Sequence, residues 1–118
     1  MGRQDYHWRH ESILYGWADG AGHEWQGGRS QDTVWEIPRP KLSEEHPTMK
    51  PVELVSRSLA NSSRLGEIVY DPFLGSGTTI IAAETLGRRC YSMDIDPRYP
   101  QVGIERWQNF TGRTAEMI

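Results

Sequence analysis

The chain has 118 residues and a mass of 13.5 kDa, which is the size of one small domain. Its formal net charge of −3, from 13 Lys and Arg against 16 Asp and Glu, excludes a strongly basic nucleic-acid-binding protein. No apolar run approaches the roughly 20 residues of a membrane-spanning helix, and the single cysteine, Cys90, excludes a disulfide scaffold. These features predict a soluble protein of a reducing compartment, the cytoplasm.

The first part of the chain, residues 1–45, is rich in Trp, His and Gly. Residues 12–17 and 33–37 contain the β-branched and aromatic residues typical of strands, and a Gly-rich stretch separates them. We predict an antiparallel strand pair joined by a loop of about fifteen residues, longer than hairpin loops usually are, which suggests a functional loop.

Aromatic side chains in this first part suggest a surface for nucleic acid. Trp25 and Arg29 lie in the Gly-rich loop and are the candidates, because aromatic rings stack on bases and Arg binds phosphate. Trp17 and Trp35 lie in the expected strands, where we predict that they belong to the core. The histidines are irregularly spaced and no cysteine joins them, so we predict no metal site.

The second part, residues 46–118, alternates helical and strand-like segments. A Pro suited to a first helical position, short apolar runs and Gly residues at segment ends mark the boundaries. The expected order is a helix from Pro51 that ends at residues 61–63, a strand at 67–70, a helix at 78–86, a strand at 90–95 and a last helix that ends near residue 110. A strand, a Gly-rich loop, a helix and a second strand form a βαβ unit with parallel strands, so the fold class is α/β.

The loop after the first of these strands contains Asp71-Pro-Phe-Leu-Gly-Ser-Gly-Thr-Thr79. Gly75 and Gly77 allow a tight turn and a close approach of the backbone to a ligand, and the following helix presents unpaired N–H groups. Asp94 ends the next strand, near the position where nucleoside-binding α/β folds place a carboxylate against ribose hydroxyls.

Several ligands are compatible with a glycine-rich turn, and the residues favour one without phosphates. Ile80 stands where a dinucleotide-binding loop has its third glycine, and no Gly-Lys-Ser/Thr of a phosphate-binding loop follows. S-adenosylmethionine offers ribose hydroxyls to Asp94 and an ammonium group to Asp71. The alternative is that the turn only connects a strand to a helix.

Three segments together resemble a known family. The segments DPFLGSGTT, EEHPTMKPVEL before it and MDIDPRY after it are similar to those of S-adenosylmethionine-dependent DNA amino-methyltransferases, which methylate the exocyclic amine of adenine or cytosine. The order, with His46-Pro-Thr-Met-Lys-Pro51 before the glycine-rich loop, resembles the branch in which the cofactor motifs follow the catalytic motif. The resemblance covers residues 44–110 well and residues 8–37 more loosely. It implies a partial Rossmann-like methyltransferase fold, with residues 1–45 as the strand pair and target-facing loop and residues 46–118 as the cofactor-binding portion.

The resemblance also implies which residues bind S-adenosylmethionine. Asp94 corresponds to the acidic residue that binds the ribose, and Thr48 and Lys50 belong to the segment that closes over the methionine end. A cation at a helix start is disfavoured by the helix dipole, which also suggests an anionic partner for Lys50. The full set of expected cofactor-binding residues is Thr48, Lys50, Asp71, Phe73, Gly75, Ser76, Gly77, Thr78 and Asp94.

The catalytic signature of this family, Asp/Asn/Ser-Pro-Pro-aromatic, has no counterpart here, because none of the seven prolines is followed by another. In the family this signature holds the target amine and stacks on the base. We therefore expect the C-terminal, cofactor-binding portion of a larger DNA-modifying enzyme, inactive by itself, whose partner is DNA. The alternative is a non-catalytic remnant or assembly module that self-associates through an exposed strand edge.

Overall fold

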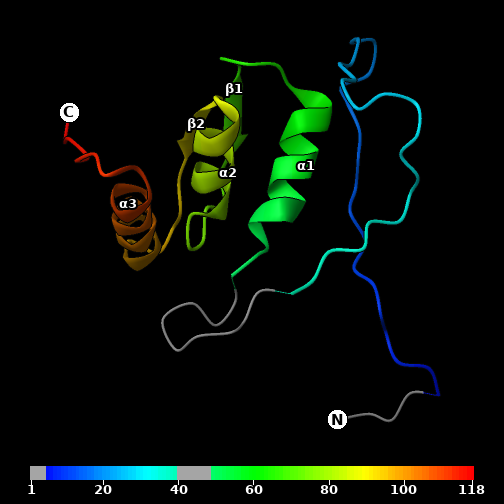
Figure 1. Ribbon diagram of the computed structural model, residues 1–118, viewed down its shortest axis with the longest axis horizontal. Coiled ribbons are helices and arrows are strands. Elements are labelled where there is room, and N and C mark those ends of the chain that lie inside the picture. Colours follow the sequence, from blue (N-terminus) through cyan, green and yellow to red (C-terminus); the bar gives the residue numbers. More distant parts are fainter. Residues whose placement is uncertain (1–4, 40–48) are drawn as a thin grey trace.

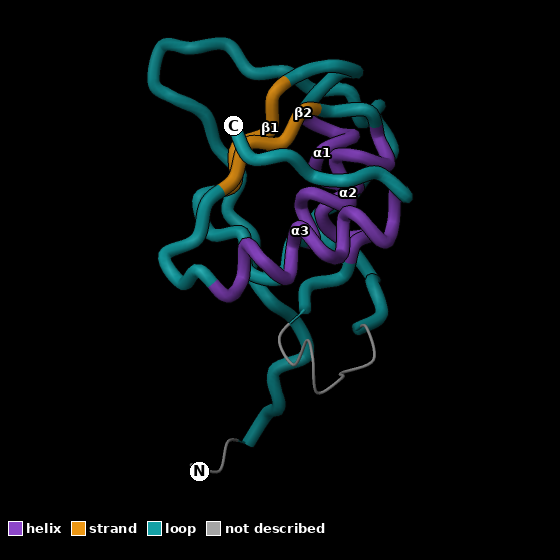
Figure 2. Tube along the Cα trace, turned by 90° about the vertical axis from the view of Figure 1, so that its left-hand side faces the viewer, coloured by secondary structure: helices purple, strands orange, loops and turns teal. Residues whose placement is uncertain are grey.

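A computed structural model describes residues 5–39 and 49–118. Figures 1 and 2 show the helices on one side of the parallel strands. In chain order the elements are α1 (Val52–Ser62), β1 (Ile68–Asp71), α2 (Thr78–Leu86), β2 (Arg89–Ser92) and α3 (Arg98–Thr111). The predicted α/β fold with a parallel βαβ core is confirmed.

Helix α2 forms the centre of the packed core and lies between α1 and α3 (Figure 1). Its apolar residues are not confined to one stripe, which is typical of a helix covered from several directions. Ile81, Ala82 and Ala83 are accordingly buried. Gly87 ends the helix in the left-handed conformation, and its N–H donates to carbonyls of the last turn. The predicted bounds of this helix are confirmed.

The two strands pair in parallel, with Tyr70 opposite Tyr91 and Val69 opposite Cys90. Side chains alternate along both strands, so that Val69 and Cys90 are half-buried while Ile68, Tyr70 and Tyr91 are exposed. The helices therefore cover one face of the sheet, and in the described ranges the other face is open. The second strand is shorter than predicted, because it ends at Ser92 and not at residue 95.

The predicted antiparallel strand pair at residues 12–17 and 33–37 is wrong. Residues 5–39 contain no strand or helix and follow the outer side of α1 (Figure 1). An isolated pair of strands is marginally stable and needs further strands or a helix beneath it. Here side-chain contacts and a backbone bond to Asn61, rather than a ladder, hold the segment in place, and the strand-like composition indicates only extended backbone.

The main attachment of this segment is a reciprocal amide pair between Gln31 and Asn61 of α1. Gln31 Nε2 donates to Asn61 Oδ1 at 2.6 Å, and Asn61 Nδ2 donates to Gln31 Oε1 at 2.9 Å. Asn61 is only 5% exposed, so these bonds satisfy a buried polar group. Arg57 adds a hydrogen bond to Gln31 Oε1 and lies over the Trp35 ring, 4.6 Å from its centroid.

The predicted core position of Trp17 is also wrong, because its side chain is 52% exposed. It stacks on His23 with the ring centroids 3.7 Å apart. Trp35 is half-buried against Arg57.

The radius of gyration is 16.2 Å, larger than the ~13.5 Å expected for a compact chain of this length, since the first segment extends along α1. No helix in residues 5–39 and 49–118 has the length and apolar character needed to cross a membrane.

Candidate functional site

The loops that follow the two strands are held together at the carboxyl edge of the sheet. The backbone N–H of Met93 donates to the Asp71 carbonyl at 3.1 Å, and that of Leu74 donates to the Met93 carbonyl at 3.0 Å. Pairing between the two segments thus continues past the strand ends. In α/β sheets this edge is where ligands bind.

Asp94 joins the loop after the second strand to the glycine-rich loop through a hydrogen bond. Its Oδ2 accepts the backbone N–H of Gly75 at 2.9 Å, and its Oδ1 accepts that of Asp96 at 2.9 Å. Gly75 has φ +57°, and a Cβ added there would meet nothing within 4 Å. The glycine is therefore needed for the backbone turn and not for packing. The structure brings together the acidic residue and the loop that the sequence suggested as one site.

Asp71 is fixed by its own loop and by α2. Its Oδ1 accepts the backbone N–H of Phe73 at 2.9 Å, and its Oδ2 accepts the Thr79 hydroxyl at 2.6 Å. Thr79 is buried, so the donor that orients the Asp71 carboxylate is itself fixed by packing and is not exchanged for water. Each oxygen retains a lone pair for a further donor.

Asp71 and Asp94 line the same cavity, which has a volume of about 330 Å³. Ligand pockets in proteins typically measure about 300–1,000 Å³. The lining combines an ammonium group, two carboxylates, loop backbone and apolar side chains: Lys50, Val55, Asp71, Phe73, Leu74, Gly75, Ser76, Thr78, Thr79, Asp94 and Tyr99. Of these, Val55 and Tyr99 were missed by sequence analysis, since only the fold brings them here, and Leu74 and Thr79 lie in the predicted loop but were not named as cofactor contacts.

Of the expected cofactor-binding residues that the structure describes, all but Gly77 line the cavity. Thr48 lies outside the described residues. Gly77 is buried with φ +90°, and a Cβ added there would lie 2.8 Å from Gly103 Cα. The structural reason for a glycine at this position is thus the close approach of α3, as well as the turn itself.

Lys50 connects the cavity to two other parts of the chain. Its carbonyl accepts the Thr78 hydroxyl at 3.2 Å, and its Nζ lies 3.5 Å from Glu11 Oε2. Its backbone is therefore tied to the start of α2, while its exposed ammonium group faces the first segment. The side chain does not cap α1, whose N-cap residue is Pro51, so that the helix begins one residue later than predicted.

Trp25 and Arg29 lie away from the cavity, near the opposite end of α1. The backbone N–H of the neighbouring Gln26 donates to the Asn61 carbonyl at 2.7 Å, whereas the cavity residue Lys50 precedes the start of the helix. An 11-residue helix is about 16 Å long. Trp25 is 44% exposed, and its indole N–H donates to the Gly28 carbonyl at 2.6 Å.

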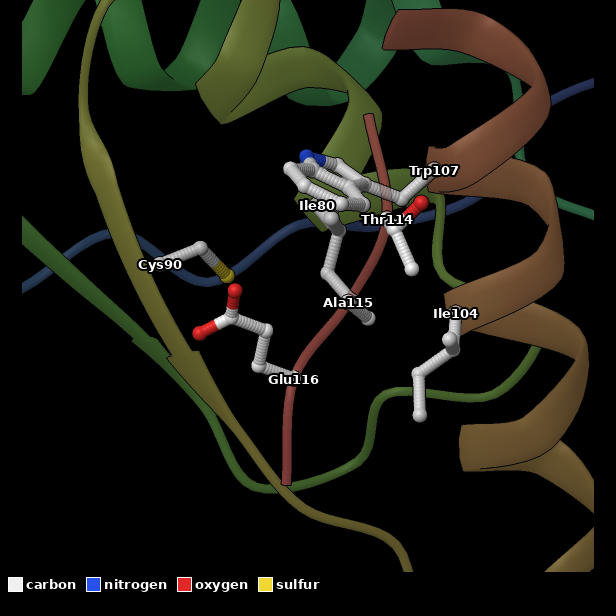
Figure 3. Close-up of a pocket in the computed structure, with 7 residues that line it drawn as sticks. All are labelled: Ile80, Cys90, Ile104, Trp107, Thr114, Ala115 and Glu116. Carbon is white, nitrogen blue, oxygen red and sulfur yellow. The ribbon is translucent and has the colours of Figure 1, made fainter. Parts of the chain in front are cut away.

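A second cavity, of about 430 Å³, lies between α2, β2, α3 and the residues after α3 (Figure 3). Its lining is mainly apolar and includes Ile80, Ile104 and Trp107. Burial raises the pKa of the Cys90 thiol there, so the neutral form is favoured. Among the residues that the structure describes, no group of His, Cys, Asp and Glu is arranged to hold a metal ion.

Comparison with known proteins identifies the family. Residues 4–105 match the DNA methylase family, so this chain belongs to it. The DNA adenine methyltransferase YhdJ of Escherichia coli (strain K12) is 40% identical over 89 residues, which are 72% of this chain and 30% of that protein. The type II methyltransferase M2.DpnII of Streptococcus pneumoniae is 36% identical over 87 residues, 70% of this chain and 32% of that protein.

Solved structures agree with this assignment. The M1.HpyAVI–SAM complex matches with a TM-score of 0.62 and 25% identity over 75% of this chain and 45% of that chain. A putative DNA modification methylase of Thermus thermophilus, complexed with S-adenosyl-L-methionine, matches with a TM-score of 0.54 and 39% identity over 63% of this chain and 31% of that chain. The chain spans about a third of the length of the two curated relatives.

Proposed function

We propose that the cavity at the carboxyl edge of the sheet binds S-adenosylmethionine, and that the chain is the cofactor-binding part of a DNA amino-methyltransferase. The observation that carries this proposal is the bond from the Gly75 N–H to the Asp94 carboxylate, because it places an acidic residue and a glycine turn on one cavity. The solved complexes of two relatives with this cofactor support it.

The donors and acceptors of the cavity fit the cofactor. The Asp94 carboxylate can accept ribose hydroxyls, and the fixed Asp71 carboxylate can accept the cofactor's ammonium group. Lys50 and the backbone N–H of Ser76 can neutralise its carboxylate, whereas the Gly75 N–H already donates to Asp94. Phe73, at the mouth, is 85% exposed and offers an apolar surface for the adenosyl part. When bound, the cofactor supplies an electrophilic methyl group on a sulfonium.

The second substrate of this proposal is the exocyclic amine of adenine or cytosine in DNA. Such an amine is a weak nucleophile, and acceptors that bind its protons increase its reactivity. This chain contains no Pro-Pro-aromatic signature that could hold the amine, so we propose that it does not transfer methyl groups by itself. Trp25 and Arg29 would then contact DNA away from the reacting base, about one α1 length from the cavity.

Isothermal titration calorimetry of the full chain with S-adenosylmethionine and S-adenosylhomocysteine tests the proposal. We expect saturable binding of both ligands and loss of binding in Asp94→Asn, which keeps the shape of the side chain but removes its charge. Asp19→Asn is the matched control, because Asp19 is exposed in a turn of the first segment. A folded wild-type chain that binds neither ligand would refute the proposal.

A second candidate function is self-association through the sheet. In the described ranges each strand has one unpaired edge, and the open face presents Ile68, Tyr70 and Tyr91. Open edges of this kind pair readily with other chains. Light scattering after size exclusion should then give a mass that rises with concentration and returns to that of a monomer in Tyr70→Lys. A monomer at all concentrations would exclude this function.

A further inference from the structure

Arg106 of α3 is a half-buried cation that contacts the loop of the cavity without lining it. Its Nη1 donates to Thr78 Oγ1 at 3.1 Å and to the Ser76 carbonyl at 3.4 Å. Burial lowers the pKa of its guanidinium below the ordinary value. Removing a charge from water is costly, and the start of a helix is the least favourable place for a cation. The two hydrogen bonds are therefore what keeps the Arg106 guanidinium in this half-buried position rather than in solvent.

The contacts of Arg106 continue to a third segment of the chain. A guanidinium only donates hydrogen bonds, so the Thr78 oxygen is the acceptor and its single proton is directed elsewhere. That proton goes to the Lys50 carbonyl, 3.2 Å from Thr78 Oγ1. Thr78 is 5% exposed, so water does not compete for this hydroxyl. The result is a directed chain of hydrogen bonds from α3 through the start of α2 to the backbone before α1.

We propose that Arg106 is a positioning residue for the cofactor cavity. Through Thr78 it fixes the backbone of Lys50, and through the Ser76 carbonyl it fixes the glycine-rich loop, two separate walls of the cavity. Arg106 does not itself line the cavity, so its effect on a ligand is transmitted through these walls. The inference rests on the proposed binding of S-adenosylmethionine at this site.

The test compares Arg106→Met and Thr78→Val, singly and together, in calorimetry with S-adenosylhomocysteine. Each single change should weaken binding about tenfold, the effect of losing one hydrogen bond to a charged group. Because both changes break the same chain of bonds, the double variant should be no weaker than the weaker single variant. Thr78→Ser keeps the hydroxyl and should bind more tightly than Thr78→Val, a rescue that general destabilisation would not give.

Arg113→Met is the matched control. Arg113 is also an arginine of the α3 region, but it pairs with Glu84 and lies over the Trp107 ring, outside the cavity. Its replacement should leave the affinity unchanged. Wild-type affinity in Arg106→Met, or losses that multiply in the double variant, would overturn the inference.

A measurement without ligand separates this inference from the proposed function. The carbonyl carbon of Lys50 should change its NMR chemical shift in Arg106→Met, although Arg106 does not touch Lys50, and should change in the same direction in Thr78→Val. An unchanged shift in Arg106→Met overturns the positioning role whether or not the wild type binds the cofactor. A wild type that binds nothing, with the shift changed as expected, refutes only the proposed function. Should Arg106→Met not fold, Arg106→Lys gives the same comparison, because it keeps the charge but lacks the guanidinium Nη1 that donates both bonds.

Discussion

Gly77 and Gly103 lie in contact, and replacing each of them by alanine should affect the free energy of unfolding differently. In Gly77→Ala the new Cβ would lie 2.8 Å from Gly103 Cα, and the residue would keep a φ of +90°. The left-handed conformation costs about 1–2 kcal/mol for a residue with a Cβ. Overpacking of a filled contact adds about 1–3 kcal/mol. Gly77→Ala should therefore lower the free energy of unfolding by about 2–5 kcal/mol.

In Gly103→Ala the new Cβ would be accommodated. Its nearest atoms are Leu74 Cδ2 at 3.5 Å, Gly77 Cα at 3.6 Å and Ile80 Cδ1 at 3.7 Å, which are ordinary van der Waals distances. Replacing a helical glycine by alanine favours the helix by about 1 kcal/mol. Gly103→Ala should thus be neutral or stabilising by up to about 1 kcal/mol. Urea unfolding followed by circular dichroism measures both variants, and a Gly103→Ala protein less stable than Gly77→Ala would refute the reasoning.

Three further predictions concern other parts of the chain. Asn61→Ala should lower the free energy of unfolding by about 1–3 kcal/mol in urea titrations, because the Gln31 amide loses its buried partner; unchanged stability would contradict this. The Arg98 side chain and its backbone N–H lower the pKa of Asp96 to about 2, so this pair stabilises the fold above about pH 4 and the contribution is lost as the pH falls to about 2. An NMR titration of the Asp96 carboxyl should show this midpoint, and Arg98→Gln should raise it; a wild-type midpoint near 4 would contradict the pairing. The raised pKa of Cys90 predicts slower alkylation by iodoacetamide at pH 8 in the folded chain than in urea, and equal rates would show that the thiol is not shielded.

The parallel core could be predicted from the sequence because local signals mark its boundaries. A glycine stands at each end of Thr78–Leu86, and short apolar runs flank the helix, so local chemistry and tertiary structure agree. The same kind of signal failed at residues 12–17 and 33–37. There the composition indicates extended backbone, but whether such backbone joins a ladder depends on what lies beside it. Here its neighbour is α1, held by the Gln31–Asn61 pair.

The candidate site could be predicted only in part. The glycine turn and Asp94 were identifiable because the order of strand, loop, helix and strand places them at one edge. Tyr99 and Val55 reach the cavity from helices whose packing no local pattern reveals. Nothing in the sequence distinguishes Arg106 from other helical arginines, and only the fold shows that it contacts the glycine-rich loop. The packing of Gly77 on α3 is likewise a property of the fold.

We infer above all that the glycine turn and Asp94 together form a binding site for S-adenosylmethionine. The most direct measurement is a ¹⁵N NMR titration of the wild-type chain with S-adenosylhomocysteine, which reports every backbone amide separately. We predict that the amide signals of Gly75, Ser76 and Asp96 shift and saturate together, while the Trp25 indole signal stays in place. Unchanged signals at the glycine turn, or shifts confined to the Trp25 region, would contradict the claim.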